Sequence, residues 1–322
     1  MNLPENPQVD VLIPAYNPKP EHLREALDSL LAQTFQNWKA LIHDDASETD
    51  VASIVEPYLT DSRITFEKSE DNLGIGGNWN VCFKKTSLPV VAFLFQDDIW
   101  SIHYLEKSVQ ILNDHPSVGL VSMNHNYKLE EGVDTPEDYE VLQVIKKQRL
   151  SPGFHEGRKY LNKWIEDGLW PNLIGEPDFV VMRREAMERA GLFKETMPQL
   201  LDAEYWVRML LKTDLYYHNK QSGSFRVHPT AASAQNRERG KALFDRFKTL
   251  DDLIKTMPRG AERKVALKAQ IKQFEMMAEK YRKKRDRGDT IKYYGIGCIK
   301  GFCMRHPIVT LRTVAQALKR DS

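Results

Sequence analysis

Short apolar runs alternate with amphipathic segments through the first two-thirds of the chain. The apolar runs predict buried strands at Val9–Pro14, Trp38–His43, Ile64–Lys68, Val90–Phe95, Val118–Met123 and Phe179–Arg183, with two short strands ending at His228. Apolar residues at helical spacing predict helices between them, over Glu21–Thr34, Val51–Leu59, Gly77–Lys85, Ile102–Asn113, Arg158–Gly168, Glu185–Ala190 and Ala203–Lys212. This alternation predicts an α/β fold with a doubly wound, mostly parallel sheet.

Two segments depart from the alternation. Lys128–Phe154 is polar, contains Pro136 and Pro152 and has no steady period, which predicts a long loop or a small excursion from the fold. After Asn236 the strand signals stop, and apolar residues repeat every three or four positions, at Leu267, Ile271, Phe274, Ala278 and Tyr281 and again at Ile308, Leu311, Ala315 and Leu318. We therefore expect two domains, an α/β domain over residues 1–235 and a helical region over 236–322.

Charge is unevenly distributed between these two parts. Of 46 basic and 45 acidic residues, 21 basic and 9 acidic ones lie in residues 241–322, so the helical region is strongly basic and the front acidic. Arg312, Gln316 and Lys319 lie largely opposite the apolar face of the last helix. A basic amphipathic region is typical of docking on an anionic membrane surface. A helical cap on the front domain and a dimer contact remain alternatives, so the oligomeric state stays open, and no nucleic-acid partner is predicted.

Cysteine content and the N-terminus bear on the compartment. Cys82, Cys298 and Cys303 are too few for a disulfide framework, and without a CxxC pair a zinc site is not expected. Met1–Gln8 has neither a basic segment nor an apolar core typical of a signal peptide, and no apolar run approaches a membrane span of about 20 residues. We expect a cytoplasmic protein, with any membrane contact at the cytoplasmic face.

Polar clusters follow the first four predicted strands. They are Tyr16-Asn17, Asp44-Asp45, Asn72–Gly77 and Asp97-Asp98. In a parallel sheet the carboxyl ends of the strands meet at one edge, where ligands bind. An aromatic ring, two acidic pairs and a glycine-rich turn at that edge suit a nucleotide.

The Asp97-Asp98 pair is the sharpest of these signals. Mg²⁺ and Mn²⁺ take one or two carboxylates and complete their shells with water and phosphate, although a solvated turn or a helix cap explains the pair equally well in isolation. The turn Gly74–Gly77 lacks the G-x-G-x-x-G spacing and follows the third strand, while Pro14–Pro18 follows the first. A nicotinamide-dependent oxidoreductase is therefore disfavoured.

Five segments in order resemble the family 2 glycosyltransferases of the GT-A fold, of the type that acts on bacterial surface polysaccharides. They are Val9–Asn17, Leu30–Phe35 (LLAQTF), His43–Ser47, Asn72-Leu73-Gly74 and Gln96-Asp97-Asp98, and the resemblance covers roughly residues 8–235. It implies a transferase that moves a hexosyl or deoxyhexosyl group from a nucleotide-sugar donor to a hydroxyl of a glycan or lipid-linked acceptor. It also implies inversion at the sugar and a divalent cofactor, Mn²⁺ or Mg²⁺.

The resemblance implies roles for individual residues. It places Asp202 as the general base, with Glu204 as the runner-up, and Asp98 and His228 at the metal. Gly175-Glu176-Pro177 resembles the stretch beside the donor sugar and acceptor. The nucleotide-sugar site would comprise Pro14, Ala15, Tyr16, Asn17, Asp45, Asn72, Gly77 and Asp97.

Two observations weaken these assignments. Many relatives carry an arginine after the glycine-rich turn, where it can meet the donor phosphates, and Trp79 stands there in this chain. Asp202 precedes a predicted helix at Ala203, so helix capping is an alternative to catalysis. The rival function is a non-catalytic protein that retains the nucleotide-sugar pocket.

Overall fold

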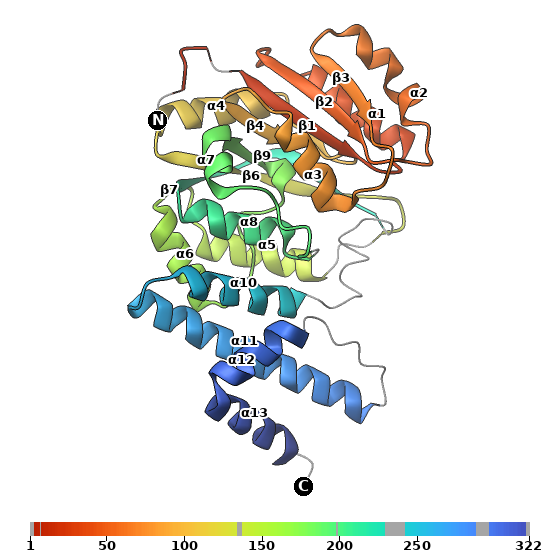
Figure 1. Ribbon diagram of the computed structural model, residues 1–322. Coiled ribbons are helices and arrows are strands. Elements are labelled where there is room, and N and C mark those ends of the chain that lie inside the picture. Colours follow the sequence, from red (N-terminus) through yellow and green to blue (C-terminus); the bar gives the residue numbers. More distant parts are fainter. Residues whose placement is uncertain are drawn as a thin grey trace. The chain divides into compact units, whose positions relative to one another are not determined.

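The computed structural model describes residues 3–6, 8–133, 137–197, 199–228, 242–287 and 296–319. The chain divides into two compact units (Figure 1). The first comprises residues 1–161 and 172–231, and the second comprises residues 162–171 and 232–322. Each unit has an apolar core of its own.

A nine-stranded sheet forms the centre of the first unit (Figure 1). Its order is β3-β2-β1-β4-β8-β6-β9-β5, and β7 pairs with β9. Strands β3, β2, β1 and β4 are mutually parallel, β6 and β9 are parallel, and β8, β5 and β7 are antiparallel to their partners. The strands are β1 (Val9–Ala15), β2 (Trp38–Asp44), β3 (Ile64–Lys68), β4 (Val90–Phe93), β5 (Ile99–Trp100), β6 (Val118–Leu129), β7 (Gly153–His155), β8 (Val180–Arg183) and β9 (Asp214–Val227).

Strand β1 is buried along its whole length and has a parallel partner on each side. Val9 is in register with Trp38 of β2 and with Val90 of β4. The chain runs outward from β1 to β2 and β3, then returns to the other side of β1 for β4. This reversal creates a topological switch point, so the loops after β1 and β4 lie next to each other at the carboxyl edge.

Helices cover both faces of this sheet, as a doubly wound fold requires. On one face, α1, α2 and α4 pack on alternate residues of β1, including Val11 and Ile13. On the other, Trp79 and Phe83 of α3 are buried, and Trp79 contacts Phe93 of β4. The helices of this unit and its border are α1 (Pro20–Leu31), α2 (Val51–Val55), η1 (Glu56–Thr60), α3 (Gly74–Lys84), α4 (Tyr104–Asp114), α5 (Glu137–Arg149), α6 (Gly157–Glu166), η2 (Pro177–Phe179), α7 (Arg184–Ala190) and α8 (Leu201–Leu210). The predicted α/β architecture is confirmed.

The predicted loop over Lys128–Phe154 is wrong. Strand β6 continues to Leu129, α5 follows, and β7 pairs with β9. Helix α5 presents Val141 and Val144 to solvent, so its sequence carries no apolar stripe. The two short strands predicted before His228 are one strand, β9. On one side β9 pairs with β6, and on its other side it pairs with β7 and then with β5.

Helices form the second unit over its described residues 162–171, 242–287 and 296–319. Phe247, Phe274 and Phe302 pack together in its core. The predicted amphipathic segments lie in α11 and α13; the four helices are α10 (Ala242–Thr256), α11 (Ala261–Asp286), α12 (Ile296–Arg305) and α13 (Pro307–Lys319). Across the described part of the chain, no helix is both long enough and apolar enough to span a membrane.

Gln33, in the LLAQTF segment, ties α1 to the loop that follows β5. Its side-chain amide donates to the carbonyls of Ser29 (3.0 Å) and Ser101 (2.9 Å), and its oxygen accepts from the Leu105 N–H (3.0 Å). Only 1% of Gln33 is exposed, so these bonds have no competition from water. The residue has a structural role in this position.

We expect Gln33→Met to lower the free energy of unfolding by about 1–3 kcal/mol, because buried backbone groups lose their partners while the side-chain volume is kept. Denaturant unfolding measures this change. Gln110→Met, on the exposed face of α4, is the matched control and should change stability by less than about 0.5 kcal/mol. Equal effects of the two substitutions would contradict the structural role of Gln33.

Candidate functional site

The loops after β1 and β4 are joined at the switch point by a reciprocal pair of hydrogen bonds. The Tyr16 N–H donates to the Gln96 side-chain oxygen (2.7 Å), and the Gln96 amide donates to the Tyr16 carbonyl (3.1 Å). The Tyr16 side chain is 49% exposed above this clamp. Gln96 thus fixes the backbone that presents an accessible aromatic ring.

The loop after β1 also organises the loop after β2. Asn17 has φ = +44°, a left-handed conformation that asparagine tolerates better than most residues. Its side-chain oxygen accepts from the N–H groups of Glu48 (2.8 Å) and Thr49 (3.2 Å), and its own N–H donates to the Ser47 hydroxyl (2.8 Å). Pro14 and Ala15 are buried at the end of β1, where the Ala15 carbonyl accepts from Asp45 N–H (2.9 Å).

Asp45 connects β2 to the glycine-rich turn. Its carboxylate accepts from the Leu73 N–H (2.8 Å), and the Asn72 side chain donates to its carbonyl (3.2 Å). Burial raises the pKa of Asp45, against the opposing effect of the backbone N–H groups of the turn. At Gly77, a Cβ would lie 2.7 Å from the Leu73 Cβ, so only glycine fits without displacing the turn. Asp45, Asn72 and Gly77 therefore form one rigid corner.

Trp79 does not face this corner. It stacks on Phe95 at 5.1 Å between ring centroids, and it meets Phe193 edge-on at 5.2 Å. Phe193 in turn stacks on Tyr205 of α8 at 3.9 Å. The side chain that replaces the expected arginine is thus part of an aromatic core beneath Gln96.

The two adjacent carboxylates after β4 face different surroundings. Asp97 Oδ2 lies 2.9 Å from His228 Nε2, and the Asp97 side chain is 23% exposed. The Asp98 side chain is buried and its Oδ1 accepts from the Arg226 N–H of β9 (2.7 Å). Burial, followed by the carboxylates of Asp178 and Asp97, holds the pKa of Asp98 well above its usual range. The family resemblance predicts Asp98 with His228 at the metal, whereas the carboxylate in contact with His228 is that of Asp97.

Arg226 fixes the position of this pair. Its Nε donates to the Asp97 carbonyl (2.9 Å), and its guanidinium forms an ion pair with Glu25. The ring of His22 lies 5.8 Å from that of His228 and contacts Glu130 through Nε2 (3.1 Å). In the ranges that the structure describes, no group of three or more His, Cys, Asp or Glu side chains is arranged to hold a metal.

Asp202 lies in the first turn of α8, which begins at Leu201, two residues before the predicted start at Ala203. The Asn172 amide donates to its Oδ2 (2.8 Å). Burial, followed by the neighbouring Glu176 carboxylate, raises the pKa of Asp202 to about 7. A carboxyl group that is half ionised near neutral pH is suited to accept a proton.

Helix α8 also contacts the segment 172–176, which contains the partner of Asp202. Trp206, which is fully buried, donates from Nε1 to the Gly175 carbonyl (2.9 Å), and the Asn172 side-chain oxygen accepts from the Gly175 N–H (3.3 Å). Burial raises the pKa of Glu176 and lowers that of Lys146 of α5 to about 8. The Glu176 carboxylate also raises the pKa of Asp178. Glu176 therefore connects Asp202 electrostatically to the Asp98–Asp178 pair.

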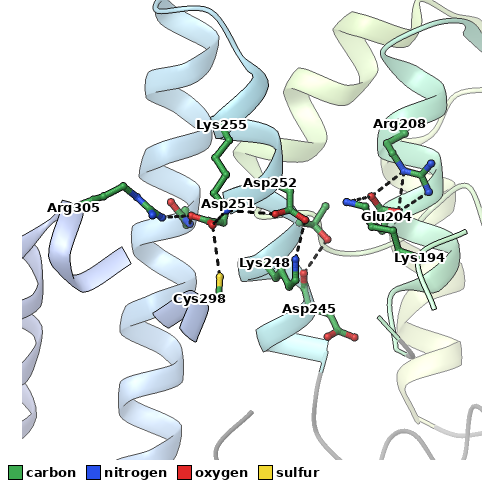
Figure 2. A network of polar contacts seen from close by, with 12 residues as sticks. Lys194, Glu204, Arg208, Asp245, Lys248, Asp251, Asp252, Lys255, Cys298 and Arg305 are labelled. Carbon is green, nitrogen blue, oxygen red and sulfur yellow. Dashed lines mark hydrogen bonds and ion pairs between the residues drawn. The ribbon is translucent and has the colours of Figure 1, made fainter. Parts of the chain in front are cut away.

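Glu204, the alternative base, is engaged elsewhere. It is two residues beyond Asp202 on α8, and residues at that spacing point to different sides of a helix. Its carboxylate forms ion pairs with Lys194 (2.9 Å) and with Arg208 (2.8 Å), and its side chain is 2% exposed (Figure 2). These contacts give Glu204 a structural role within the first unit.

Comparison with known proteins identifies the family. The profile described as "Glycosyl transferase family 2" matches residues 10–189, more than half of the chain. The chain belongs to glycosyl transferase family 2. It is thus a glycosyltransferase, and the matched residues include the Tyr16, Asp45 and Asp97 loops.

Individual relatives are distant. An uncharacterised protein of Mycobacterium tuberculosis is 25% identical over 248 residues, 73% of this chain and 75% of the relative. An uncharacterised glycosyltransferase of Rickettsia typhi is 25% identical over 247 residues, 75% of this chain and 72% of the relative. The Escherichia coli UDP-Glc:alpha-D-GlcNAc-diphosphoundecaprenol beta-1,3-glucosyltransferase WfgD is 34% identical over 106 residues, 32% of this chain and 40% of WfgD.

Solved structures share the fold. Staphylococcus aureus TarS 1–349 in complex with UDP-GlcNAc has a TM-score of 0.59 at 17% identity, over 86% of this chain and 72% of that chain; the match spans 43% of a longer TarS chain. The mannosyltransferase PcManGT from Pyrobaculum calidifontis, in complex with GDP-Man and Mn²⁺, has a TM-score of 0.58 at 18% identity, over 97% of this chain and 84% of that chain. The expected GT-A fold is confirmed.

Three positions in the glycosyltransferase were not assigned a role from sequence. Gln96 has no role of its own in the segment Gln96-Asp97-Asp98, Asn172 lies 30 residues before its partner Asp202, and Lys146 lies in the segment predicted to be a loop. No local pattern distinguishes a glutamine or asparagine that positions a loop from one in solvent. A lysine on a helix without an apolar stripe gives no signal of burial either.

We expect Asp202→Asn to stabilise the glycosyltransferase above pH 7 and to have little such effect near pH 4. The pKa of Asp202 is about 7 in the folded chain and 3.8 as the reference value, so the folded state binds more protons between these values. The free energy of unfolding of the wild type therefore falls as the pH rises through this window, and the Asn variant lacks that loss. Thermal unfolding at a series of pH values measures the gap; a gap that is constant from pH 4 to 8 would contradict the raised pKa.

Proposed function

We propose that this glycosyltransferase moves a hexosyl or deoxyhexosyl group from a nucleoside-diphosphate-sugar to a hydroxyl of a glycan or lipid-linked acceptor, with inversion, in cell-surface polysaccharide synthesis. The observation that carries the proposal is Asp202, a carboxyl group with a pKa of about 7 held by Asn172 beside Glu176. Three similar proteins support a nucleoside-diphosphate-sugar as the donor. WfgD is named as a glucosyltransferase that uses UDP-Glc, TarS was solved with UDP-GlcNAc, and PcManGT was solved with GDP-Man.

The donor's nucleoside is assigned to the corner formed by the loops after β1, β2 and β3. The exposed Tyr16 ring offers a stacking face for the base, and the Gln96 clamp keeps it in place. Asp45, Asn72 and Gly77 form the adjoining wall, with the Asp45 carboxylate as the acceptor for a base or ribose donor. Pro14, Ala15 and Asn17 act through the backbone by shaping this corner.

A divalent cation, Mn²⁺ or Mg²⁺, is assigned to Asp97 and His228. Their facing atoms are 2.9 Å apart, and a carboxylate with an imidazole is a donor set that such cations accept. Two protein ligands suit a cation whose shell is completed by diphosphate oxygens and water. When bound, the cation would neutralise charge on the departing diphosphate. Asp98 instead holds the β9 backbone through the Arg226 N–H.

Asp202 acts as the general base. The acceptor hydroxyl attacks the anomeric carbon, the bond from that carbon to the diphosphate oxygen breaks, and the hydroxyl proton passes to the Asp202 carboxylate. The nucleoside diphosphate leaves with the bonding electron pair. Asn172 keeps Asp202 oriented and favours its ionised form, since a hydrogen bond to a carboxylate lowers its pKa. Direct displacement of this kind inverts the anomeric centre.

We expect Asp202→Asn to lower kcat by at least about two orders of magnitude, because the amide cannot accept the proton. The wild-type kcat should fall below a pH of about 7, as Asp202 becomes protonated. Asn172→Ala removes a bond to the ionised carboxylate and should move this acidic limb to higher pH. Initial rates at saturating donor and acceptor, measured across pH, test all three statements.

Glu204→Gln separates the two candidate bases. If Glu204 were the base, its Gln variant would lose turnover while Asp202→Asn stayed active. Absence of turnover in the wild type with every donor, despite donor binding, would instead favour a non-catalytic nucleotide-sugar-binding protein.

We expect Asp97→Asn and His228→Ala to abolish the Mn²⁺-dependent stabilisation by a nucleotide-sugar. A ligand at 100 times its dissociation constant raises the free energy of unfolding by about 2.7 kcal/mol, which thermal shift detects readily. A panel of UDP-, GDP- and TDP-sugars with Mn²⁺ or with chelator identifies the donor.

Asp98→Asn is the matched control for the metal assignment. Its amide oxygen can still accept from the Arg226 N–H, so the folded variant should keep the Mn²⁺-dependent shift. Retention of the shift by Asp97→Asn together with its loss in Asp98→Asn would return the metal to Asp98.

A further inference from the structure

The last two helices of the second unit carry the most exposed apolar side chains among the described residues. Ile308 is 81% exposed, Met304 79% and Leu311 71%, and no other large apolar side chain in the described ranges exceeds 54%. Val314 is 48% exposed. Ile308, Leu311 and Val314 follow one another at three-residue steps on α13, so they share one side of the helix. Met304 ends α12 immediately before them.

The opposite sides of these helices are packed. Phe302 of α12 is fully buried, with ring centroids 5.3 Å from Phe247 of α10 and 4.9 Å from Phe274 of α11. Thr313 of α13 is also buried, and Val309 packs against the same core. The core of the second unit is therefore packed by one side of α12 and α13, and the exposed apolar residues lie on the other side.

Polar contacts fix the rotation of α12. The buried Asp251 carboxylate of α10 forms an ion pair with Arg305 and accepts from Gln270 of α11 (2.9 Å), and the Cys298 thiol lies 3.6 Å from its second oxygen (Figure 2). Lys255 completes the neutralisation of this carboxylate (2.6 Å). The contacts of Arg305 and Cys298 with Asp251 favour the orientation of α12 in which Met304 is exposed.

The charge of this segment has one sign. Residues 296–319 contain Lys300, Arg305, Arg312 and Lys319 but neither Asp nor Glu. Lys300 is exposed, and Arg312 is exposed while contacting Glu275 (3.0 Å). An exposed apolar side on a segment that contributes cations and no anions is the pattern of helices that lie in the headgroup region of a bilayer.

We propose that α12 and α13 dock the protein on the surface of an anionic lipid bilayer. Met304, Ile308, Leu311 and Val314 enter the boundary between headgroups and acyl chains, and the exposed Lys300 and Arg312 side chains meet lipid phosphates. The inference deepens the proposed function, because a docked enzyme meets a lipid-linked acceptor at the surface where that acceptor resides. The binding itself is independent of which sugar is transferred.

Flotation of the full chain with vesicles tests the proposal. We expect binding to vesicles of phosphatidylcholine with phosphatidylglycerol, weaker binding to phosphatidylcholine alone, and loss of binding at high salt. Ile308→Ser combined with Leu311→Ser should weaken vesicle binding at least about tenfold, since two inserted side chains become polar. Both positions are exposed, so the fold should persist, which circular dichroism checks. Removal of the whole segment is unsuitable because Phe302 belongs to the core.

Two further variants sharpen the result. Lys300→Gln should weaken binding to the anionic vesicles and leave binding to neutral vesicles unchanged. Leu59→Ser replaces an exposed leucine of η1 outside the surface and should bind as the wild type does.

Three outcomes would overturn the proposal. The first is equal vesicle binding by the double variant and the wild type, and the second is vesicle binding that is insensitive to salt and lipid charge. The third is a wild type that does not bind vesicles but forms a dimer that the double variant cannot form. The last would assign the surface to a second copy of the chain. Transfer to a water-soluble acceptor should be unaffected by the double substitution, so failure of docking and failure of the proposed activity remain distinguishable.

Discussion

The parallel pairing of β1 with both β2 and β4 is the constraint on which the candidate site depends. Since β1 is buried along its length, its register is fixed from both sides, and the loops that follow β1 and β4 must leave the sheet next to each other. The reciprocal bonds between Tyr16 and Gln96 then close this junction. The stacking of Trp79 on Phe95, the residue before Gln96, packs α3 against the same loop. An exposed aromatic ring is thereby presented by a rigid frame.

A second feature of the molecule is the series of carboxyl groups that extends from the buried Asp98 and Asp178 through Glu176 to Asp202, the last two being partly exposed. Burial raises the pKa of all four, and neighbouring carboxylates raise those of Asp98, Asp178 and Asp202 further, whereas Lys146 lowers that of Glu176. Both Asp178 carboxyl oxygens are buried, and the only side-chain group in the described structure that can share a proton with them is the Asp98 carboxyl. Such an arrangement destabilises the folded chain, and function commonly accounts for strain of this kind. Asp202 differs from the others because an amide holds it and its pKa is about 7.

The second unit also contains a buried carboxylate, but there the carboxylate has cationic partners. Three phenylalanines form a small core, and the buried Asp251 is neutralised by Lys255 and Arg305 rather than left strained. The carboxyl groups of the first unit differ in this respect. A carboxylate with cationic partners stays ionised and orients helices, whereas burial near other carboxylates raises the pKa of a carboxyl group. The fixed orientation of α12 and α13 leaves an apolar, cationic surface exposed.

Local spacing determined much of the protein. The alternation of apolar runs with helical periods predicted the doubly wound sheet, and the order of the motifs placed Tyr16, Asp45 and Asp97 at strand ends, because both signals are contained in neighbouring residues. Helix α5 was not predicted, because its exposed residues Val141 and Val144 prevent its apolar residues from forming a single stripe at helical spacing. Tertiary structure alone decided which of two consecutive carboxylates meets His228: a β9 backbone N–H, more than a hundred residues away, occupies Asp98 and leaves Asp97 to the histidine. The partnership of Asn172 with Asp202 and the engagement of Glu204 by Lys194 were likewise settled by packing, because contacts between distant residues leave no trace in the spacing of either one.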